Sequence, residues 1–194
     1  MNRKKTDRLA ACRQFYAKMI AAGTGQLRDD LERAFEIESI SWGPDRGLAM
    51  PYISGMHVAT PTDDPIHVYQ NVLFALDRER RIDSGEPFLH GQLLGALAPV
   101  RRNVALHIGC GTAILAHLVG PSGKVVACEI EPELGHRALE NLKPWDNVQV
   151  RIASGIDKLP RGDAIYVNAG ATHPVDSWLD ALDERGKLLF PSSV

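Results

Sequence analysis

Short apolar runs alternate with helical patterns through the second half of this chain, and that alternation limits the folds it can adopt. Strand-like runs are expected at residues 104–108, 125–130, 148–152, 164–167 and 188–190. Helical spacing is expected between them, over residues 113–119, 132–142 and 176–182. Strands that alternate with helices imply right-handed crossovers and a doubly wound parallel sheet. We therefore predict an α/β fold for residues 100–194.

Residues 1–99 follow a different pattern. Apolar residues at helical spacing predict two amphipathic helices, over about 7–22 and 26–37, which together would form an N-terminal helical cap. Glycines and prolines between residues 41 and 65 predict a long loop or lid. Residues 67–76 are strand-like in part, 77–81 form a charged turn, and 88–97 are expected to be helical.

The overall composition weighs against several classes of partner. The 194 residues carry a formal net charge of -2, so we expect no nucleic acid and no membrane as partner. No apolar run is long enough for a signal or membrane segment. The three cysteines are far apart and the histidines share no spacing. This favours buried thiols in a cytoplasmic protein, and we predict no metal.

A glycine pair follows the first predicted strand and precedes a helix. Gly109 and Gly111 would let the backbone turn sharply and approach a ligand closely. A dinucleotide site would have a third glycine where this chain has Ile114, which weakens a role in binding pyrophosphate. Glu129 ends the next predicted strand and could accept hydrogen bonds from both ribose hydroxyls. An adenosine ligand is the favoured interpretation, and a plain tight turn with a solvated strand end is the alternative.

Several motifs together resemble one family of enzymes. They are Ile108-Gly109-Cys110-Gly111-Thr112 and the runs at residues 119–126, 129–134, 147–151, 159–160 and 186–191. In these motifs the chain resembles the protein-L-isoaspartate O-methyltransferases. The resemblance implies a Rossmann-like doubly wound sheet of the class I methyltransferase type that binds S-adenosylmethionine. It assigns residues 100–194 to the cofactor, and residues 1–99 to the helical cap and the acceptor side.

The resemblance also implies the positions of the cofactor contacts. In that family the glycine loop lies beside the methionine part, the acid matching Glu129 holds the ribose, and the segment matching residues 154–156 lies against the adenine. The cofactor-binding residues predicted on this basis are His107, Gly109, Cys110, Gly111, Thr112, Glu129, Ile130, Ser154, Gly155, Ile156 and Asn168. Two of them have a structural alternative: His107 as a strand histidine and Asn168 as a turn residue. Ser154 replaces a usual aspartate, so the adenine contact would carry no charge.

The acceptor side departs from the family. Its signature has two hydroxyl residues where this chain has Pro87 and Leu89. Isoaspartate repair therefore cannot be carried over, although Gly85 is retained. His90 is the one polar side chain of this segment that could reach a reacting atom, where it could serve as a general base, with a structural role as the alternative.

Two hypotheses of different classes follow. The first is methyl transfer from S-adenosylmethionine to a carboxylate or other oxygen of a small molecule, peptide or protein, other than isoaspartate. The alternative is a non-catalytic adenosyl-binding module or interaction protein that keeps the fold. A nucleotide-dependent oxidoreductase is disfavoured by Ile114. Since relatives continue with two more strands, we expect that C-terminal strands are missing here, or that a partner such as a second copy in a homodimer covers the sheet edge.

Overall fold

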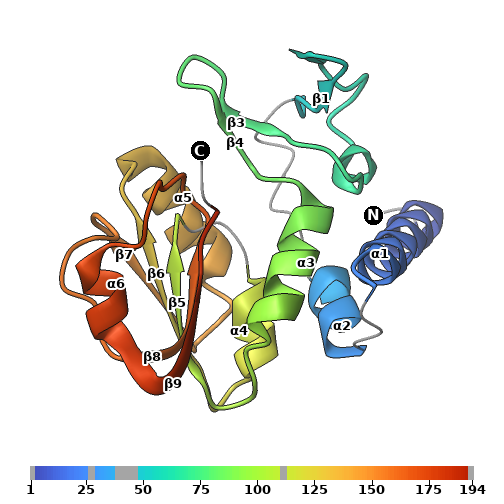
Figure 1. The fold of residues 1–194 in the computed structure, drawn as a ribbon. Helices are drawn as coiled ribbons and strands as arrows, with labels where there is room; N and C mark the ends of the chain where they lie inside the picture. Colours follow the sequence, from blue (N-terminus) through green and yellow to red (C-terminus); the bar gives the residue numbers. More distant parts are fainter. Residues whose placement is uncertain (1–2, 26–28, 38–47, 110–112, 192–194) are drawn as a thin grey trace. The chain divides into compact units, whose positions relative to one another are not determined.

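The computed structural model describes residues 3–25, 29–37, 48–109 and 113–191 (Figure 1). The chain divides into two compact units, Met1–Gly95 and Ala96–Val194, and each is described here by itself. No helix in the described ranges combines the length and apolarity needed to cross a membrane.

The second unit is built on a five-stranded parallel sheet. Its strands are β5 (Val104–Ile108), β6 (Lys124–Glu129), β7 (Val148–Ile152), β8 (Gly162–Val167) and β9 (Leu182–Leu189). Their order is β7-β6-β5-β8-β9, and every pair is parallel. The chain thus starts in the middle of the sheet, moves to one edge, returns and moves to the other. The doubly wound α/β fold predicted from the sequence is confirmed.

Three helices connect these strands: α4 (Ile114–Val119), α5 (Pro132–Leu142) and α6 (Asp176–Ala181). α6 lies over one face of the sheet, where Trp178 packs in a buried cluster with Leu106 and Ile108 of β5. Gly135 of α5 lies against Ile152, which points to the other face. Helices on both faces leave the central strands β5, β6 and β8 buried on both sides, which explains why these strands are apolar runs in the sequence.

One strand boundary differs clearly from the expectation. The last strand, predicted at residues 188–190, begins at Leu182, and α6 ends one residue earlier, at Ala181. The first half of β9 carries Asp183, Glu184 and Arg185, of which the last two are exposed. A search for apolar runs misses such a strand, because its polar side chains reach solvent at the edge of the sheet.

The first unit begins with the two predicted helices. α1 (Arg3–Gly23) and α2 (Asp29–Ile37) pack together through buried side chains, with the rings of Tyr16 and Phe35 6.2 Å apart in an edge-to-face contact. The helix α3 (Pro87–Leu97) begins at a proline, which suits the first helical position because that residue needs no backbone donor. A Cβ on Gly91 of α3 would lie 2.7 Å from the methyl carbon of Thr24, so α3 approaches the end of α1 closely.

The segment between α2 and α3 is more ordered than expected. The predicted loop at residues 41–65 contains the hairpin strands β1 (Tyr52–Ile53) and β2 (Met56–His57), joined by Ser54 and Gly55, both with positive φ. Residues 38–47 lie outside the described ranges.

The prediction of a strand within residues 67–76 is wrong over the first part of that range. That part belongs to a 3-10 helix, η2 (Pro65–Val68), whose first turn is capped by the side chain of Asp64. Strand structure is limited to β3 (Ala75–Asp77), which pairs with β4 (Ile82–Asp83) across the predicted charged turn.

Candidate functional site

The carboxyl ends of the parallel strands lie together along one side of the second unit, which is called the carboxyl edge below. Gly109 follows β5, Ile130 follows β6, Ala153 follows β7 and Asn168 follows β8. In an open α/β sheet a ligand binds outside these ends, where the strand order reverses. Here the reversal lies beside β5, so this edge is the candidate site.

Gly109 makes the turn at the end of β5. Its φ is +76°, and its backbone N–H donates to the carbonyl of Cys128 at 2.9 Å. The N–H of Asn168 donates to the carbonyl of Ile108 at 2.7 Å, which brings the two strand ends together. A Cβ on Gly109 would lie 3.0 Å from the carbonyl oxygen of Asn168. Conformation and space therefore both demand glycine here.

The other predicted contacts of the glycine loop, Cys110, Gly111 and Thr112, lie outside the described residues.

Glu129 places a carboxylate at the same edge. Its side chain is only 7% exposed, and its Oε1 accepts a hydrogen bond from the backbone N–H of Glu131 at 2.9 Å. Its carbonyl accepts from the N–H of Ala153 at 3.0 Å, which fixes the start of the loop after β7. An ionised carboxylate can accept about four hydrogen bonds. The geometry fits a carboxylate that binds neighbouring hydroxyls.

The loop after β7 is held tightly against the sheet. A Cβ on Gly155 would overlap the side chain of Ile108, so the backbone lies directly on β5. The Ser154 hydroxyl accepts a long hydrogen bond, 3.4 Å, from the N–H of Ile156. Ile130 and Ile156 are 63% and 59% exposed. Two exposed isoleucines at this edge suit the flat, weakly polar faces of a nucleobase.

His107 lies one residue before the end of β5 and is fully buried. Its ring stacks on that of Tyr166 with centroids 5.2 Å apart and an interplanar angle of 30°. A ring enclosed in this way fits the structural alternative better than a ligand contact. Its role toward a cofactor stays a prediction.

His90 lies in the first unit, on α3. Its Nε2–H donates to the carbonyl oxygen of Ser84 at 3.1 Å, and its backbone N–H donates to the carbonyl of Glu86. Burial lowers the pKa of His90, although the bond to Ser84 opposes that shift. The side chain would also overlap a Cβ on Gly85, whose φ is +80°. These contacts favour a neutral, structural imidazole, and the catalytic role of His90 stays a prediction.

Comparison with known proteins gives the family. A model of the protein-L-isoaspartate(D-aspartate) O-methyltransferase family matches residues 59–193. The chain belongs to this family. The family resemblance predicted from the motifs is thereby confirmed.

Curated relatives carry the same family name. The protein-L-isoaspartate O-methyltransferase 2 of Archaeoglobus fulgidus is 39% identical over 90 residues, which are 43% of this chain and 41% of the relative. The protein-L-isoaspartate O-methyltransferase of Methanopyrus kandleri is 33% identical over 130 residues, 57% of this chain and 58% of the relative. The chain thus spans about half the length of these relatives.

Solved structures match the fold over a larger part of the chain. A protein-L-isoaspartate O-methyltransferase has a TM-score of 0.72 at 21% identity and covers 93% of this chain, which spans 55% of that protein. A Plasmodium falciparum protein of the same family name, in complex with S-adenosyl-L-homocysteine, has a TM-score of 0.68 at 18% identity, with coverage of 94% and 84%. At these identities the likeness shows the fold, and the predicted Rossmann-like class I methyltransferase fold is confirmed.

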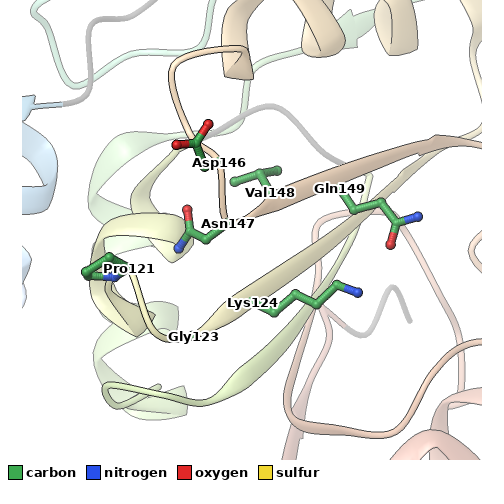
Figure 2. A pocket seen from close by; sticks show the side chains of 7 residues that line it. All are labelled: Pro121, Gly123, Lys124, Asp146, Asn147, Val148 and Gln149. Carbon is green, nitrogen blue, oxygen red and sulfur yellow. The ribbon is translucent and has the colours of Figure 1, made fainter.

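A hollow of about 500 Å³ lies at the amino ends of the strands, opposite the carboxyl edge (Figure 2). Its lining residues come from the amino ends of β6 and β7 and the turns before them: Pro121, Gly123, Lys124, Asp146, Asn147, Val148 and Gln149. The amide of Asn147 donates to the carbonyls of Ala116 and Gly120 at 3.1 and 2.9 Å, so it satisfies the end of α4. None of the predicted cofactor-binding residues lines this hollow.

Two interactions had no signal in the sequence. His57 Nε2 lies 2.8 Å from Asp83 Oδ1 and joins β2 to β4 in the first unit. The indole N–H of Trp178 donates to the carbonyl of Gly155 at 2.8 Å in the second unit. Each joins residues more than 20 positions apart along the chain. No group of three or more metal-ligating side chains comes together in the described part of the molecule.

Proposed function

We propose that this chain binds S-adenosylmethionine at the carboxyl edge of its sheet and directs methyl transfer to an oxygen acceptor. The observation that carries the proposal is the nearly buried Glu129 carboxylate at the same edge as the positive-φ turn at Gly109. The family supports it, and a relative of the same fold is named as a complex with S-adenosyl-L-homocysteine.

Each part of the edge has a proposed task. The Glu129 carboxylate accepts hydrogen bonds from the ribose hydroxyls, each worth roughly 1.5–3 kcal/mol because one partner is charged. The turn at Gly109 brings the backbone close to the methionine part, and residues 154–156 lie against the adenine with Ile130. When bound, S-adenosylmethionine supplies a methyl group activated by a sulfonium. The chain supplies orientation and excludes water.

The acceptor is proposed to be a carboxylate or another oxygen of a small molecule, peptide or protein. A carboxylate is already nucleophilic, so the chain has only to position it, and no general base is required. We further propose an acceptor other than isoaspartate, because Leu89 is 46% exposed and places an apolar side chain where the family has a hydroxyl. Pro87 at the start of α3 likewise offers no hydroxyl.

Methyl transfer from labelled S-adenosylmethionine to a panel of acceptors tests this proposal. The panel contains an isoaspartyl peptide, the matched aspartyl peptide, and free mono- and dicarboxylic acids. We expect transfer to a carboxylate other than isoaspartate, and loss of transfer in Glu129→Gln. Isoaspartyl peptide as the preferred acceptor would contradict the acceptor proposal while leaving the cofactor proposal intact.

A second candidate function is a non-catalytic module that binds an adenosyl ligand. Two observations on the acceptor side favour it: the exposed Leu89, and the bond that commits His90 Nε2 to the Ser84 carbonyl. This candidate predicts binding of S-adenosylhomocysteine with no transfer to any member of the panel.

Residues 1–99 are proposed to supply the acceptor side and residues 100–194 the cofactor side. A homodimer through β9 also stays a prediction. Sedimentation over a range of concentrations tests it, and a monomer throughout would contradict it.

A further inference from the structure

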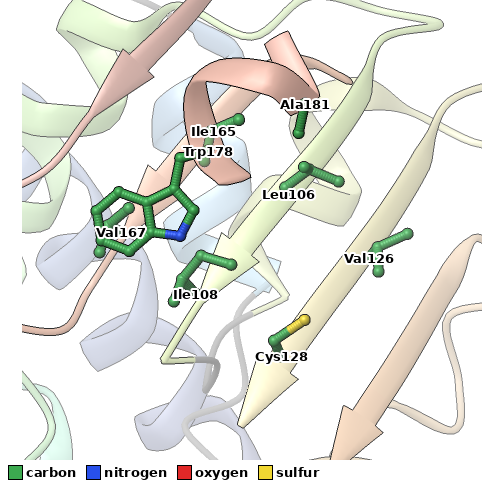
Figure 3. Close-up of a cluster of buried hydrophobic side chains, with 8 residues drawn as sticks. All are labelled: Leu106, Ile108, Val126, Cys128, Ile165, Val167, Trp178 and Ala181. Carbon is green, nitrogen blue, oxygen red and sulfur yellow. The ribbon is translucent and has the colours of Figure 1, made fainter. Parts of the chain in front are cut away.

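An indole N–H ties the helix α6 to the loop after β7. Trp178 is 4% exposed, and its Nε1–H donates to the carbonyl of Gly155 at 2.8 Å. Figure 3 shows the indole nitrogen turned towards Ile108, the residue on which Gly155 lies. The ring is also 6.3 Å from that of Phe190 in a tilted contact. Packing therefore fixes the orientation of the indole independently of its hydrogen bond to Gly155.

The loop is thus held at one residue by two contacts. The Ile108 side chain occupies the space that a Cβ of Gly155 would need. The Trp178 indole binds the Gly155 carbonyl. The bonds within the loop are weaker, at 3.4 Å from Ile156 N–H to the Ser154 hydroxyl and 3.3 Å from Asp157 N–H to the Ser154 carbonyl. The position of this backbone therefore depends on Trp178 more than on the loop itself.

We propose that Trp178 is a positioning residue for adenine recognition. The proposal rests on the function proposed above. Ser154 offers a neutral hydroxyl, and a neutral group discriminates between bases only if its position is fixed, because its hydrogen bond is weak and directional. Trp178 fixes that position by holding the neighbouring carbonyl, so α6 contributes to base specificity without touching the base.

The test is the affinity of Trp178→Phe for two ligands, S-adenosylhomocysteine and S-inosylhomocysteine, which differ in the base edge. Phenylalanine keeps an aromatic ring in the cluster and removes the donor together with part of the buried ring volume. The inosyl ligand reports how much of any loss comes from the lost packing. Loss of one hydrogen bond corresponds to about a 3- to 10-fold change in an equilibrium constant. We expect a loss of that size for the adenosyl ligand and less than about 2-fold for the inosyl ligand. The matched control is Trp145→Phe, which should leave both affinities unchanged. Trp145 is a half-buried tryptophan between α5 and β7, at the amino ends of the strands.

An equal loss of affinity for both ligands would mean that Trp178 acts only through general packing. No loss of affinity for either ligand would mean that the bond from Trp178 to Gly155 does not contribute to binding. Either result overturns the inference. Failure of the wild-type chain to bind S-adenosylhomocysteine would instead overturn the proposed function. The chain has three tryptophans, so their indole N–H resonances can be assigned in the wild-type protein with Trp42→Phe and Trp145→Phe.

These resonances keep the inference testable if Trp178→Phe does not fold. Saturating S-adenosylhomocysteine should shift the Trp178 resonance and slow its hydrogen exchange, because the ligand would hold the loop in place. An unchanged Trp178 resonance in the saturated protein would contradict the inference.

Discussion

Gly109→Ala probes the turn on which the proposed cofactor site depends. The φ of +76° lies in the left-handed region, which an alanine occupies at a cost of roughly 1–2 kcal/mol. The added Cβ would also lie 3.0 Å from the Asn168 carbonyl oxygen and 3.5 Å from the Ala169 Cβ. The strand end would have to shift by a few tenths of an ångström.

The expected net effect is a loss of about 1–2 kcal/mol in the free energy of unfolding. The strain and the close contact oppose the gain of about 0.4–1 kcal/mol that alanine brings by restricting the unfolded chain. Affinity for S-adenosylhomocysteine should fall as well, because the backbone that approaches the ligand has moved.

Urea unfolding measures the first effect, with Gly170→Ala as the matched control. Gly170 follows the neighbouring strand, β8, but a Cβ there meets nothing within 4 Å. The control should be as stable as the wild type or slightly more stable. Equal stabilities of Gly109→Ala and Gly170→Ala would refute the argument that Gly109 is required by conformation and space.

Three further predictions concern titration and pairing. Burial lowers the pKa of His90 below its ordinary value of about 6.5, so in mildly acidic solution the unfolded chain binds more protons than the folded protein. The free energy of unfolding should therefore fall from pH 7 to pH 5, and it should fall less steeply in His90→Gln. Burial raises the pKa of Cys128, so in a variant with the other two cysteines replaced the folded protein should react with a thiol reagent only at higher pH than the unfolded chain; equal rates would contradict this. Asp83→Asn should lower the free energy of unfolding by about 0.5–1.5 kcal/mol through the bond to His57, and an unchanged urea midpoint would show that the pair contributes nothing.

The sheet was predictable because its signal is local. Buried parallel strands leave continuous apolar runs, as at residues 164–167, and the intervening helices leave a period of 3.6. The edge strand at residues 148–152 alternates apolar and polar side chains. Its bounds and those of the helix at residues 132–142 match the structure residue for residue. The positions of Gly109 and Glu129 were predictable for the same reason, because each stands directly at the end of a strand. Their contacts with a cofactor stay predictions. The strand β9 was predicted only at its end, since its first half is polar and edge-exposed.

Contacts between distant segments left no such signal. Two such contacts are the bond from Trp178 to Gly155 and the pair of His57 with Asp83. They depend on which helix or hairpin packs beside which, and the spacing of residues along the sequence does not indicate this. The hairpin of β1 and β2 falls within the predicted loop, because its strands are two residues long and a period of two cannot be recognised in so short a run.

Calorimetric titration with S-adenosylhomocysteine tests the central claim most directly. The wild-type chain should bind one equivalent, NAD should give no heat, and Glu129→Gln should bind about 10- to 100-fold more weakly, because an amide replaces a charged acceptor of the ribose hydroxyls. A folded wild-type chain that gives no heat with S-adenosylhomocysteine, or a Glu129→Gln variant that binds as tightly as the wild type, would contradict the account.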